Sequence, residues 1–294
     1  MNPITYIDRA TGEPIIESVM GDKALRFAYE TLAGRTLWPI LFGTRWLSAW
    51  MGRRYDSPRS RASIRALASI PGCRAEEAEK PIDEYPSFNA FFTRHLKPGA
   101  RPLGEGIVSP ADGRLRLYLK AAATEPFPLK GATRCLREVF GPVGAPPVPD
   151  GRYDIAVIRL APVDYHRFHF PCDLTSSAPV ISIPGRYDSV NPIALVRRPD
   201  VYANNERQIF CGEAAFGPLW LVDVGAFGVG TIVQTYSGTT HRKGDEKGYF
   251  KFGGSTVILI TRANALTFDA DLVENSRKGL ETRVLCRERI AREN

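Results

Sequence analysis

The chain has 294 residues, of which 44% are hydrophobic and 24% charged, and these values fit a folded soluble protein with a sizeable core. No stretch approaches the roughly 20 apolar residues of a membrane-spanning helix, so none is expected. The formal net charge is +7, and the same excess lies between Lys23 and Arg65, where nine basic residues face Glu30 and Asp56. An anionic partner is therefore plausible for the N-terminal part of the chain.

The five cysteines are scattered, their number is odd, and no two of them form a C-x-x-C pair. This pattern argues against a disulfide framework or a structural zinc site, and it favours a reducing compartment. The residues from Met1 to Asp8 lack a basic start followed by an apolar run, so we expect no signal peptide.

Residues 1–20 are expected to be irregular or to form a short strand, and residues 22–54 to be helical. Three of the four tryptophans lie in the helical stretch, and arginines stand among its apolar residues. This composition favours amphipathic helices in a membrane interface, with rings at headgroup depth and guanidinium groups on phosphates. The alternative is a helical cap that packs on the main domain and turns a solvated basic face outward.

Two further helices are expected before the chain changes character. Residues 57–70 read as a short basic helix, and Ser87 is a good N-cap for the next one. Because Phe88, Phe91 and Phe92 follow Ser87 at helical spacing, this linker helix should dock its aromatic side chains on the core.

From residue 105 onward, short β-type runs alternate with glycine and proline turns, and two helical insertions interrupt them. The expected strands are Arg114–Lys120, Tyr153–Leu160, Ser177–Ile183, Gln208–Glu213, Leu219–Val224, Gly230–Tyr236, Ser255–Thr261 and Thr282–Arg287, and the insertions are Ala132–Phe140 and Pro192–Arg197. This spacing predicts an α+β protein whose core is a mainly antiparallel β-sandwich or partly closed barrel. We expect a helical, membrane-associating region at 1–100 and a β-rich catalytic domain at 101–294.

Two glycines interrupt the expected strand around Ser255, in the sequence Gly253-Gly254-Ser255-Thr256. A glycine in a strand usually marks a bulge, a bend or a close backbone approach, so a glycine bulge with a structural serine is one interpretation. The other interpretation is chemical, because a permissive backbone opens the Gly254 carbonyl to attack by the Ser255 hydroxyl.

A carboxylate and two histidines are candidates for activating that hydroxyl. Asp112 lies in the turn Ser109-Pro-Ala-Asp-Gly113, where it either bonds the turn backbone or presents its carboxylate to a neighbour. His166 and His169 stand at i and i+3 in an aromatic segment between prolines, which favours proton transfer over a purely structural role. The other two histidines stand alone and are expected to be structural or solvated.

Carboxylate, imidazole and hydroxyl together supply the orienting group, the base and the attacker of an activated nucleophile. A zinc hydrolase that uses the two histidines is an alternative, although the H-x-x-H spacing differs from the helical H-E-x-x-H pattern. A non-enzymatic membrane-binding module, anchored by the helices, is a second alternative. Nucleic-acid binding is disfavoured because the basic residues are interleaved with large apolar ones.

Several motifs in the same order resemble the phosphatidylserine decarboxylases, a family of pyruvoyl enzymes. They span about residues 80–265 and are Phe91-Phe-Thr-Arg-His-Leu-Lys-Pro-Gly-Ala-Arg-Pro102, Ser109-Pro-Ala-Asp-Gly113, Asp164-Tyr-His-Arg-Phe-His-Phe-Pro171, Asn205-Glu-Arg207 and Lys247-Gly-Tyr-Phe-Lys-Phe-Gly-Gly-Ser-Thr256. The better-known bacterial pattern has Leu-Gly-Ser-Thr at the last of these motifs. Gly253 departs from it, which should loosen the cleavage turn.

The resemblance implies that the chain cuts itself between Gly254 and Ser255. His169, oriented by Asp112, would take the Ser255 proton, and the hydroxyl would attack the Gly254 carbonyl to form an ester. Elimination and loss of ammonia would then leave a covalent pyruvoyl group in place of Ser255, on a fragment of residues 255–294. The resemblance assigns no metal.

The implied reaction converts phosphatidylserine to phosphatidylethanolamine and CO2 through a Schiff base with the pyruvoyl group, and His166 is the acid that returns a proton. A soluble amino-acid substrate is a rival, but it would not require the basic, aromatic N-terminal region. The expected partners are phosphatidylserine, an anionic membrane surface, the two fragments bound to each other and a second copy in a homodimer. The expected location is the cytoplasmic side of the cell membrane, as a peripheral protein.

Overall fold

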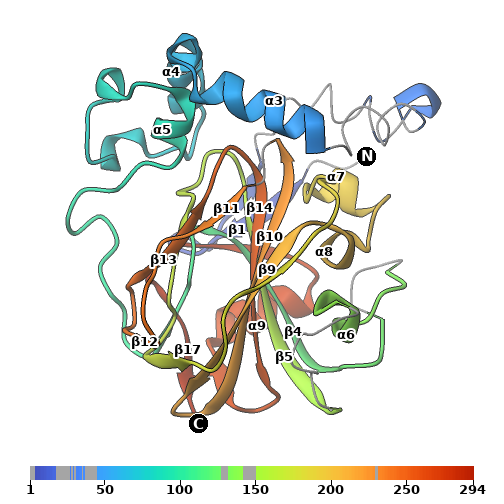
Figure 1. The fold of residues 1–294 in the computed structure, drawn as a ribbon. Coiled ribbons are helices and arrows are strands. Elements are labelled where there is room, and N and C mark those ends of the chain that lie inside the picture. Colours follow the sequence, from blue (N-terminus) through green and yellow to red (C-terminus); the bar gives the residue numbers. More distant parts are fainter. Residues whose placement is uncertain are drawn as a thin grey trace.

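The structure is a computed structural model that describes residues 4–17, 27, 29, 31–34, 36, 45–126, 132–141, 150–228 and 231–294. Of the helical stretch expected at residues 22–54, residues 22–26, 28, 30, 35 and 37–44 lie outside the described residues, and the rest includes a helix that begins at Arg45. Figure 1 shows a central body of strands, with helices α3, α4 and α5 along one end of it.

The strands are β1 Thr5–Asp8, β2 Pro14–Ile16, β3 Ile107–Val108, β4 Gly113–Ala122, β5 Arg152–Leu160, β6 Arg167–His169, β7 Leu174–Ser176, β8 Ile181–Ile183, β9 Arg207–Ala214, β10 Gly217–Gly228, β11 Ile232–Gln234, β12 Thr240–His241, β13 Glu246–Phe250, β14 Gly253–Arg262, β15 Leu266–Phe268, β16 Glu281–Val284 and β17 Arg289–Glu293. The α-helices are α3 Arg45–Asp56, α4 Ala62–Ala68, α5 Phe88–Phe92, α6 Leu136–Val139, α7 Pro192–Leu195, α8 Val201–Asn204 and α9 Ala270–Arg277. Short 3-10 turns lie at Pro58–Arg61, Ala75–Glu77 and Ile82–Glu84.

An 11-stranded sheet forms the centre of the fold, in the order β12-β7-β9-β10-β14-β5-β4-β16-β1-β2 with β8 paired to β9. Two three-stranded sheets, β11-β13-β6 and β15-β17-β3, accompany it. Among the described strands, only β1 and β16 pair in parallel. The expected α+β class with a mainly antiparallel sheet is confirmed, and the described strands do not close into a barrel because β12 and β2 remain separate ends.

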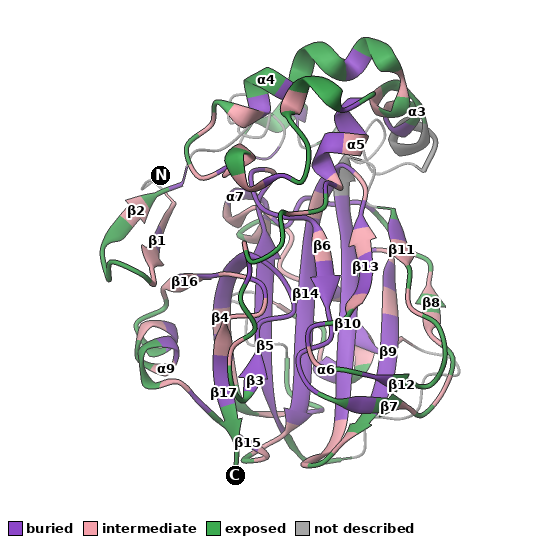
Figure 2. Cartoon of the chain, turned by 90° about the vertical axis from the view of Figure 1, so that its left-hand side faces the viewer, coloured by how far each residue is buried: buried purple, intermediate pink, exposed green. Residues whose placement is uncertain are grey.

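Strand β14 lies in the middle of the large sheet, between β10 and β5, and is buried on both faces (Figure 2). Its side chains alternate, so that Val257 and Leu259 join one hydrophobic cluster while Ile258 and Ile260 join another on the opposite face. The first cluster also contains Phe168 of β6, so the sheet β11-β13-β6 packs against that face. A strand held on both edges and both faces stays in place even if the chain is cut near its start.

The helices α3, α4 and α5 lie over the end of the sheet at which β14 begins (Figure 1). Ser87 is the expected N-cap of α5, since its Oγ accepts a hydrogen bond from the Ala90 amide at 3.2 Å. The helix is only five residues long, and Phe88, Phe91 and Phe92 enter a third hydrophobic cluster as expected. No helix within the described residues is long and apolar enough to cross a bilayer.

The N-terminal lead-in belongs to the large sheet, because β1 pairs with β16 near the other end of the chain. Strand β2 then pairs with β1 at the edge of the sheet. The domain division expected near residue 100 stays a prediction, although these two strands place part of the first hundred residues in the sheet.

A buried cluster of charges ties this lead-in to the centre of the fold. Glu17 follows β2 and accepts hydrogen bonds from the Arg159 guanidinium at 3.1 and 2.7 Å. Arg159 also donates to Glu281 of β16 at 3.1 and 2.6 Å, and Arg114 Nε lies 3.8 Å from Glu17 Oε1. Because Glu17, Arg114 and Arg159 are all buried, each charge depends on its neighbours for compensation.

Replacing Glu17 with glutamine should lower the free energy of unfolding by about 3 kcal/mol, because two buried guanidinium groups lose a countercharge while Arg159 keeps Glu281. Urea unfolding of chains that also carry Ser255→Ala, and so share one covalent structure, measures the change. The matched control is Asp83→Asn, which removes the pair between Arg65 and Asp83, whose side chains are 75% and 69% exposed. The control should lose less than about 0.5 kcal/mol, and equal losses in the two variants would contradict the assigned role of the buried cluster.

Candidate active site

Ser255 lies near the start of β14, where the sheet fixes the backbone on both sides. It is fully buried, and it pairs with Gly225 of β10 and with Leu160 of β5. The register of the β10 pairing shifts between Gly225 and Gly228, opposite Gly253, whose φ is 150°. The irregularity lies next to the glycines, but the extra residue is on β10, since three residues of β10 span two of β14. Glycine is the residue that adopts the φ of Gly253 without strain.

At Gly254 the reason for a glycine is different, because a side chain would not fit there. A Cβ atom built on it would lie 3.2 Å from Ala226 Cβ and 3.3 Å from Val190 Cγ2. Both distances are shorter than ordinary van der Waals contacts, so a side chain here would push against the wall of the site. The backbone at Gly254 therefore lies close against two neighbouring side chains.

The loop that carries Val190 is held by Asn205, which is fully buried. The Asn205 side chain donates to the carbonyls of Asp188 and Gly225, each at 2.8 Å, and accepts from the Asp188 amide at 3.1 Å. Since Gly225 is the partner of Ser255, one side-chain amide ties the covering loop to the strand beside the site. Asn205 was not among the expected site residues, because the motif Asn205-Glu-Arg207 reads equally well as a solvated turn.

The Ser255 hydroxyl faces one histidine of the predicted pair. Ser255 Oγ lies 3.4 Å from His166 Nδ1, and His166 Nε2 lies 3.1 Å from the carbonyl oxygen of Ala161. A carbonyl oxygen only accepts hydrogen bonds, so Nε2 carries the proton of the neutral ring and Nδ1 presents its lone pair to the hydroxyl. The contact is long for an O–H···N hydrogen bond, but catalytic contacts commonly tighten only when the reaction begins.

His166 is neutral because of its surroundings. It is fully buried, and its ring stacks on Phe92 with 3.8 Å between the centroids. Burial, together with the charge of Arg94, lowers the pKa of His166 to about 3. An uncharged imidazole beside a hydroxyl is the arrangement of a general base and its nucleophile.

The carbonyl that orients His166 is itself fixed by Asp164. The Asp164 carboxylate accepts a hydrogen bond from the Ala161 amide at 2.6 Å and pairs with Arg114, and the Asp164 amide donates to the Ala161 carbonyl at 2.9 Å. Asp164 was not among the expected site residues. Its signal is local, because an aspartate four residues beyond the end of β5 is well placed to close a turn on the backbone.

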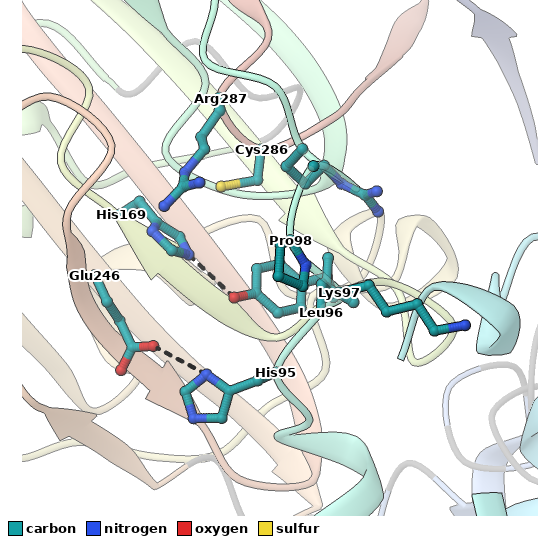
Figure 3. A pocket seen from close by; sticks show the side chains of 11 residues that line it. His95, Leu96, Lys97, Pro98, His169, Glu246, Cys286 and Arg287 are labelled. Carbon is teal, nitrogen blue, oxygen red and sulfur yellow. Dashed lines mark hydrogen bonds and ion pairs between the residues drawn. The ribbon is translucent and has the colours of Figure 1, made fainter. Parts of the chain in front are cut away.

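His169 has other partners. Its Nδ1 lies 3.0 Å from the carbonyl oxygen of Gly244 and therefore carries a proton, and its Nε2 lies 3.1 Å from the hydroxyl of Tyr165. Burial lowers the pKa of His169 to about 4. Figure 3 shows His169 on the wall of a cavity of about 250 Å³, close to Arg287. The described residues that line this cavity do not include Ser255.

Asp112 is buried, and it holds its turn against the C-terminal part of the chain. It accepts hydrogen bonds from Arg101 at 3.0 and 2.6 Å and from the Cys286 amide at 2.7 Å. Burial alone would raise the pKa of Asp112, but the hydrogen bonds and charge of Arg101 lower it below its usual value. Its negative charge also acts through space on His166 and His169, favouring the protonated form of each ring.

The structure thus brings Ser255 and His166 into contact. His169 and Asp112 are linked to each other through the turn that carries Asp112. The link between the last two is the His169 amide, which donates to the carbonyl of Pro110 in the Asp112 turn at 2.7 Å. The contact at Ser255 can remove the hydroxyl proton and so support attack on an adjacent carbonyl. Within the described part of the chain, no group of three or more His, Cys, Asp or Glu side chains is placed to hold a metal ion.

A profile of the phosphatidylserine decarboxylase family matches residues 88–292, which include every residue of this site. The chain belongs to the phosphatidylserine decarboxylase family. The phosphatidylserine decarboxylase proenzyme of Fusobacterium nucleatum is 38% identical over 99% of this chain and 98% of its own length. Those of Chlamydia pneumoniae and Ruminiclostridium cellulolyticum are each 38% identical over 98% of this chain, covering 96% and 97% of their own lengths.

Membership of the family confirms the reaction class that the motifs predict, which is the decarboxylation of phosphatidylserine by a carboxy-lyase of phospholipid biosynthesis. Proenzymes of this family carry a pyruvoyl group made from a serine, so the expected kind of cofactor is confirmed too. The zinc hydrolase and the non-enzymatic module are thereby set aside.

Proposed function

We propose that Ser255 is the serine from which the pyruvoyl group is made, and that the chain is cut between Gly254 and Ser255 in the process. The observation that carries this proposal is the 3.4 Å contact between Ser255 Oγ and the unprotonated Nδ1 of His166. The glycine before Ser255 supports it, because its backbone packs against Ala226 and Val190 and its carbonyl belongs to the residue adjacent to the hydroxyl.

The cleavage begins when the Ser255 hydroxyl gives up its proton and Oγ bonds to the carbonyl carbon of Gly254. The peptide C–N bond breaks as its nitrogen takes up a proton, which leaves an ester between the two residues. β-Elimination then removes the α proton of residue 255, breaks the Cβ–Oγ bond and releases the Gly254 carboxylate, which separates residues 1–254 from residues 255–294. Water hydrolyses the imine tautomer of the resulting dehydroalanine to the pyruvoyl group and releases ammonia. The fragments stay associated because β14 remains paired with β10 and β5.

The surroundings of Ser255 fit a pyruvoyl group, which is uncharged and close to serine in size, because the site is fully buried and offers a neutral imidazole. Such a group supplies an electron-withdrawing carbonyl that supports the loss of CO2. The contribution of the chain is to exclude water through the stack of Phe92 on His166, and to accept and return a proton at His166 Nδ1, which carries none at rest.

Under this proposal His166 contacts the reacting atoms in both stages. For the cleavage, the family resemblance implies His169 as base and Asp112 as its orienting group. The contact at Ser255 makes His166 the base in this proposal, and His169 and Asp112 are kept as residues that assist the cleavage. Two observations support this assignment. The His169 amide bonds to Pro110 in the Asp112 turn, and the negative charge of Asp112 favours the protonated form of both histidine rings. Because His169 Nε2 is engaged by Tyr165, its part in the cleavage requires that this hydrogen bond be exchanged.

The intact mass of the purified protein tests the role of Ser255. We expect wild type to consist of two fragments, of which the smaller spans residues 255–294 and begins with a pyruvoyl group, and Ser255→Ala to be a single chain. A matched control is Ser276→Ala, which changes another buried serine in the same fragment and should be processed normally. A wild-type chain that stays whole with an unmodified Ser255 would contradict the proposal.

Single alanine variants of the two histidines separate their roles. His166→Ala should lose decarboxylation and slow cleavage by about 100-fold, the usual contribution of a positioned base, and His169→Ala should slow cleavage. His95→Ala is the control, since His95 is 56% exposed and its ring lies 3.9 Å from Glu246. Cleavage is followed on denaturing gels and decarboxylation as CO2 released per pyruvoyl group.

The same gels give the pH dependence of cleavage. Because the pKa of His166 is lowered to about 3 and that of His169 to about 4, both rings stay unprotonated as the pH falls from 8 to 5. Wild-type cleavage should therefore show no drop near the ordinary histidine pKa of about 6.5. A drop near that pH would contradict the assignment of a neutral, buried histidine as the base. A His166→Ala variant that cleaves and decarboxylates like wild type would contradict the role of His166.

We also propose that the helical end of the molecule binds the anionic surface of the cell membrane, from the cytoplasmic side. Helix α3 exposes Trp50, with the Arg54 guanidinium 5.9 Å from the ring centroid, and Leu32 is 74% exposed. Exposed arginines continue along the following segment, at Arg59, Arg61 and Arg65. An amphipathic aromatic ring beside guanidinium groups suits the headgroup region of a bilayer that contains the phospholipid substrate.

Reversing two charges on α3 should weaken this binding. Arg53→Glu with Arg54→Glu should lower the affinity for vesicles of phosphatidylcholine and phosphatidylglycerol by more than about tenfold, since each basic residue near an anionic surface contributes about 1 kcal/mol. Arg277→Glu with Lys278→Glu is the control, because it makes the same charge change at the end of α9. Cosedimentation measures both, and equal losses would argue against a binding face at α3.

The homodimer stays a prediction.

A further inference from the structure

The segment that precedes the proposed cleavage bond is held by the helical region, through Asn89. Phe252 lies two residues before Gly254, and its backbone amide donates a hydrogen bond to Asn89 Oδ1 at 3.0 Å. The Asn89 side-chain amide in turn donates to Asp56 Oδ1 at 3.0 Å. Asn89 is 3% exposed and its hydrogen bond to Phe252 is buried, whereas its bond to Asp56 reaches a side chain that is 48% exposed.

The hydrogen bond to Phe252 continues a backbone ladder. The Phe250 amide donates to the carbonyl of His166 at 2.9 Å and the Lys251 amide to that of Thr231 at 3.0 Å. Phe252 is the next residue, and the Asn89 side chain takes the place of a backbone carbonyl for it. The chain is thus anchored at Phe252 on one side and, through the pairing of Ser255 with Leu160, on the other.

The same helix also holds the base. Phe92 of α5 stacks on His166 at 3.8 Å, and the Phe252 ring packs edge-on against Phe92 and Phe88 at 5.1 and 5.0 Å. Tyr55 of α3 closes this group at 4.5 Å from Phe252. Asn89 therefore lies on the element that sets the distance between the chain to be cut and the imidazole.

Two glycines between these anchors give the Gly254 carbonyl unusual freedom, because glycine has no Cβ to restrict its backbone. Attack by Ser255 requires that carbonyl at a defined position. We propose that Asn89 is a positioning residue for self-cleavage, which fixes Phe252 so that the Gly254 carbonyl is presented to Ser255 Oγ. This inference rests on the proposed cleavage between Gly254 and Ser255.

The inference distinguishes the two stages of the enzyme. Before cleavage, Asn89 acts on residue 255 through the intervening peptide bonds. After cleavage, residues 252 and 255 belong to different fragments, and the restraint on Phe252 no longer reaches the pyruvoyl group. Loss of the Asn89 contacts should therefore slow cleavage and leave the turnover of each cleaved molecule largely unchanged.

The experiment follows the appearance of the two fragments with time after synthesis in a cell-free system, by denaturing gel and intact mass. Asn89→Leu, which removes both hydrogen bonds at similar side-chain size, should cleave at least about tenfold more slowly than wild type. Decarboxylation per pyruvoyl group should stay within about twofold once cleavage is complete. Ser87→Ala is the matched control, since it removes the N-cap of the same helix and leaves both Asn89 contacts in place.

A pair of charge-exchanged variants covers the case in which Asn89→Leu does not fold. Asn89→Asp keeps the acceptor for the Phe252 amide but faces Asp56 with a second carboxylate, so it should cleave slowly. When Asp56→Asn is added, the amide at position 56 can donate to the carboxylate at position 89, so the double variant should recover the rate of cleavage. Asp56→Asn alone, which keeps an acceptor for Asn89, should cleave nearly as fast as wild type.

The outcomes separate the two proposals. If wild type itself remains whole, the proposed function fails before Asn89 matters. If wild type is cut and a folded Asn89→Leu is cut as fast, or Ser87→Ala is slowed equally, Asn89 is structural and the inference is overturned. Failure of Asp56→Asn to rescue Asn89→Asp overturns it as well.

Discussion

The site depends on one constraint, which is the burial of a neutral histidine against a serine hydroxyl in the middle of a sheet. Ser255 is held by the pairing of β14 with β10 and β5, and His166 by the Ala161 carbonyl and the stack on Phe92. Burial keeps the imidazole unprotonated, and the carbonyl decides which ring nitrogen has the free lone pair. The proposed proton transfer at Ser255 requires these two conditions.

Segments far apart in the sequence meet to satisfy these conditions. Asp164 fixes the Ala161 turn and pairs with Arg114, which in turn lies beside Glu17 from the N-terminal lead-in. From the opposite side, α5 brings Phe92 onto His166 and Asn89 onto Phe252. The helical end of the molecule, which we assign to the membrane, is thus in direct contact with the chain beside Ser255.

Much of the sheet could be predicted because its central strands are continuous runs of β-branched and apolar residues. The expected Tyr153–Leu160 and Ser255–Thr261 differ from β5 and β14 by at most two residues at an end. Strand β6 and the first part of β13 were not predicted, since they are short and carry buried charged residues such as Lys247. Their places are set by pairing with each other and by packing on the large sheet, which local patterns do not report.

The sequence by itself determined the family, the class of reaction and the residue types of the site, because several motifs with their chemistry follow one another in a fixed order. It did not determine which histidine touches Ser255. His166 and His169 are three residues apart, and their directions depend on the Ala161 turn, on the pairing of β6 with β13 and on Phe92 from α5. Those contacts join distant parts of the chain, so only the tertiary structure placed His166 at the hydroxyl and His169 with Tyr165.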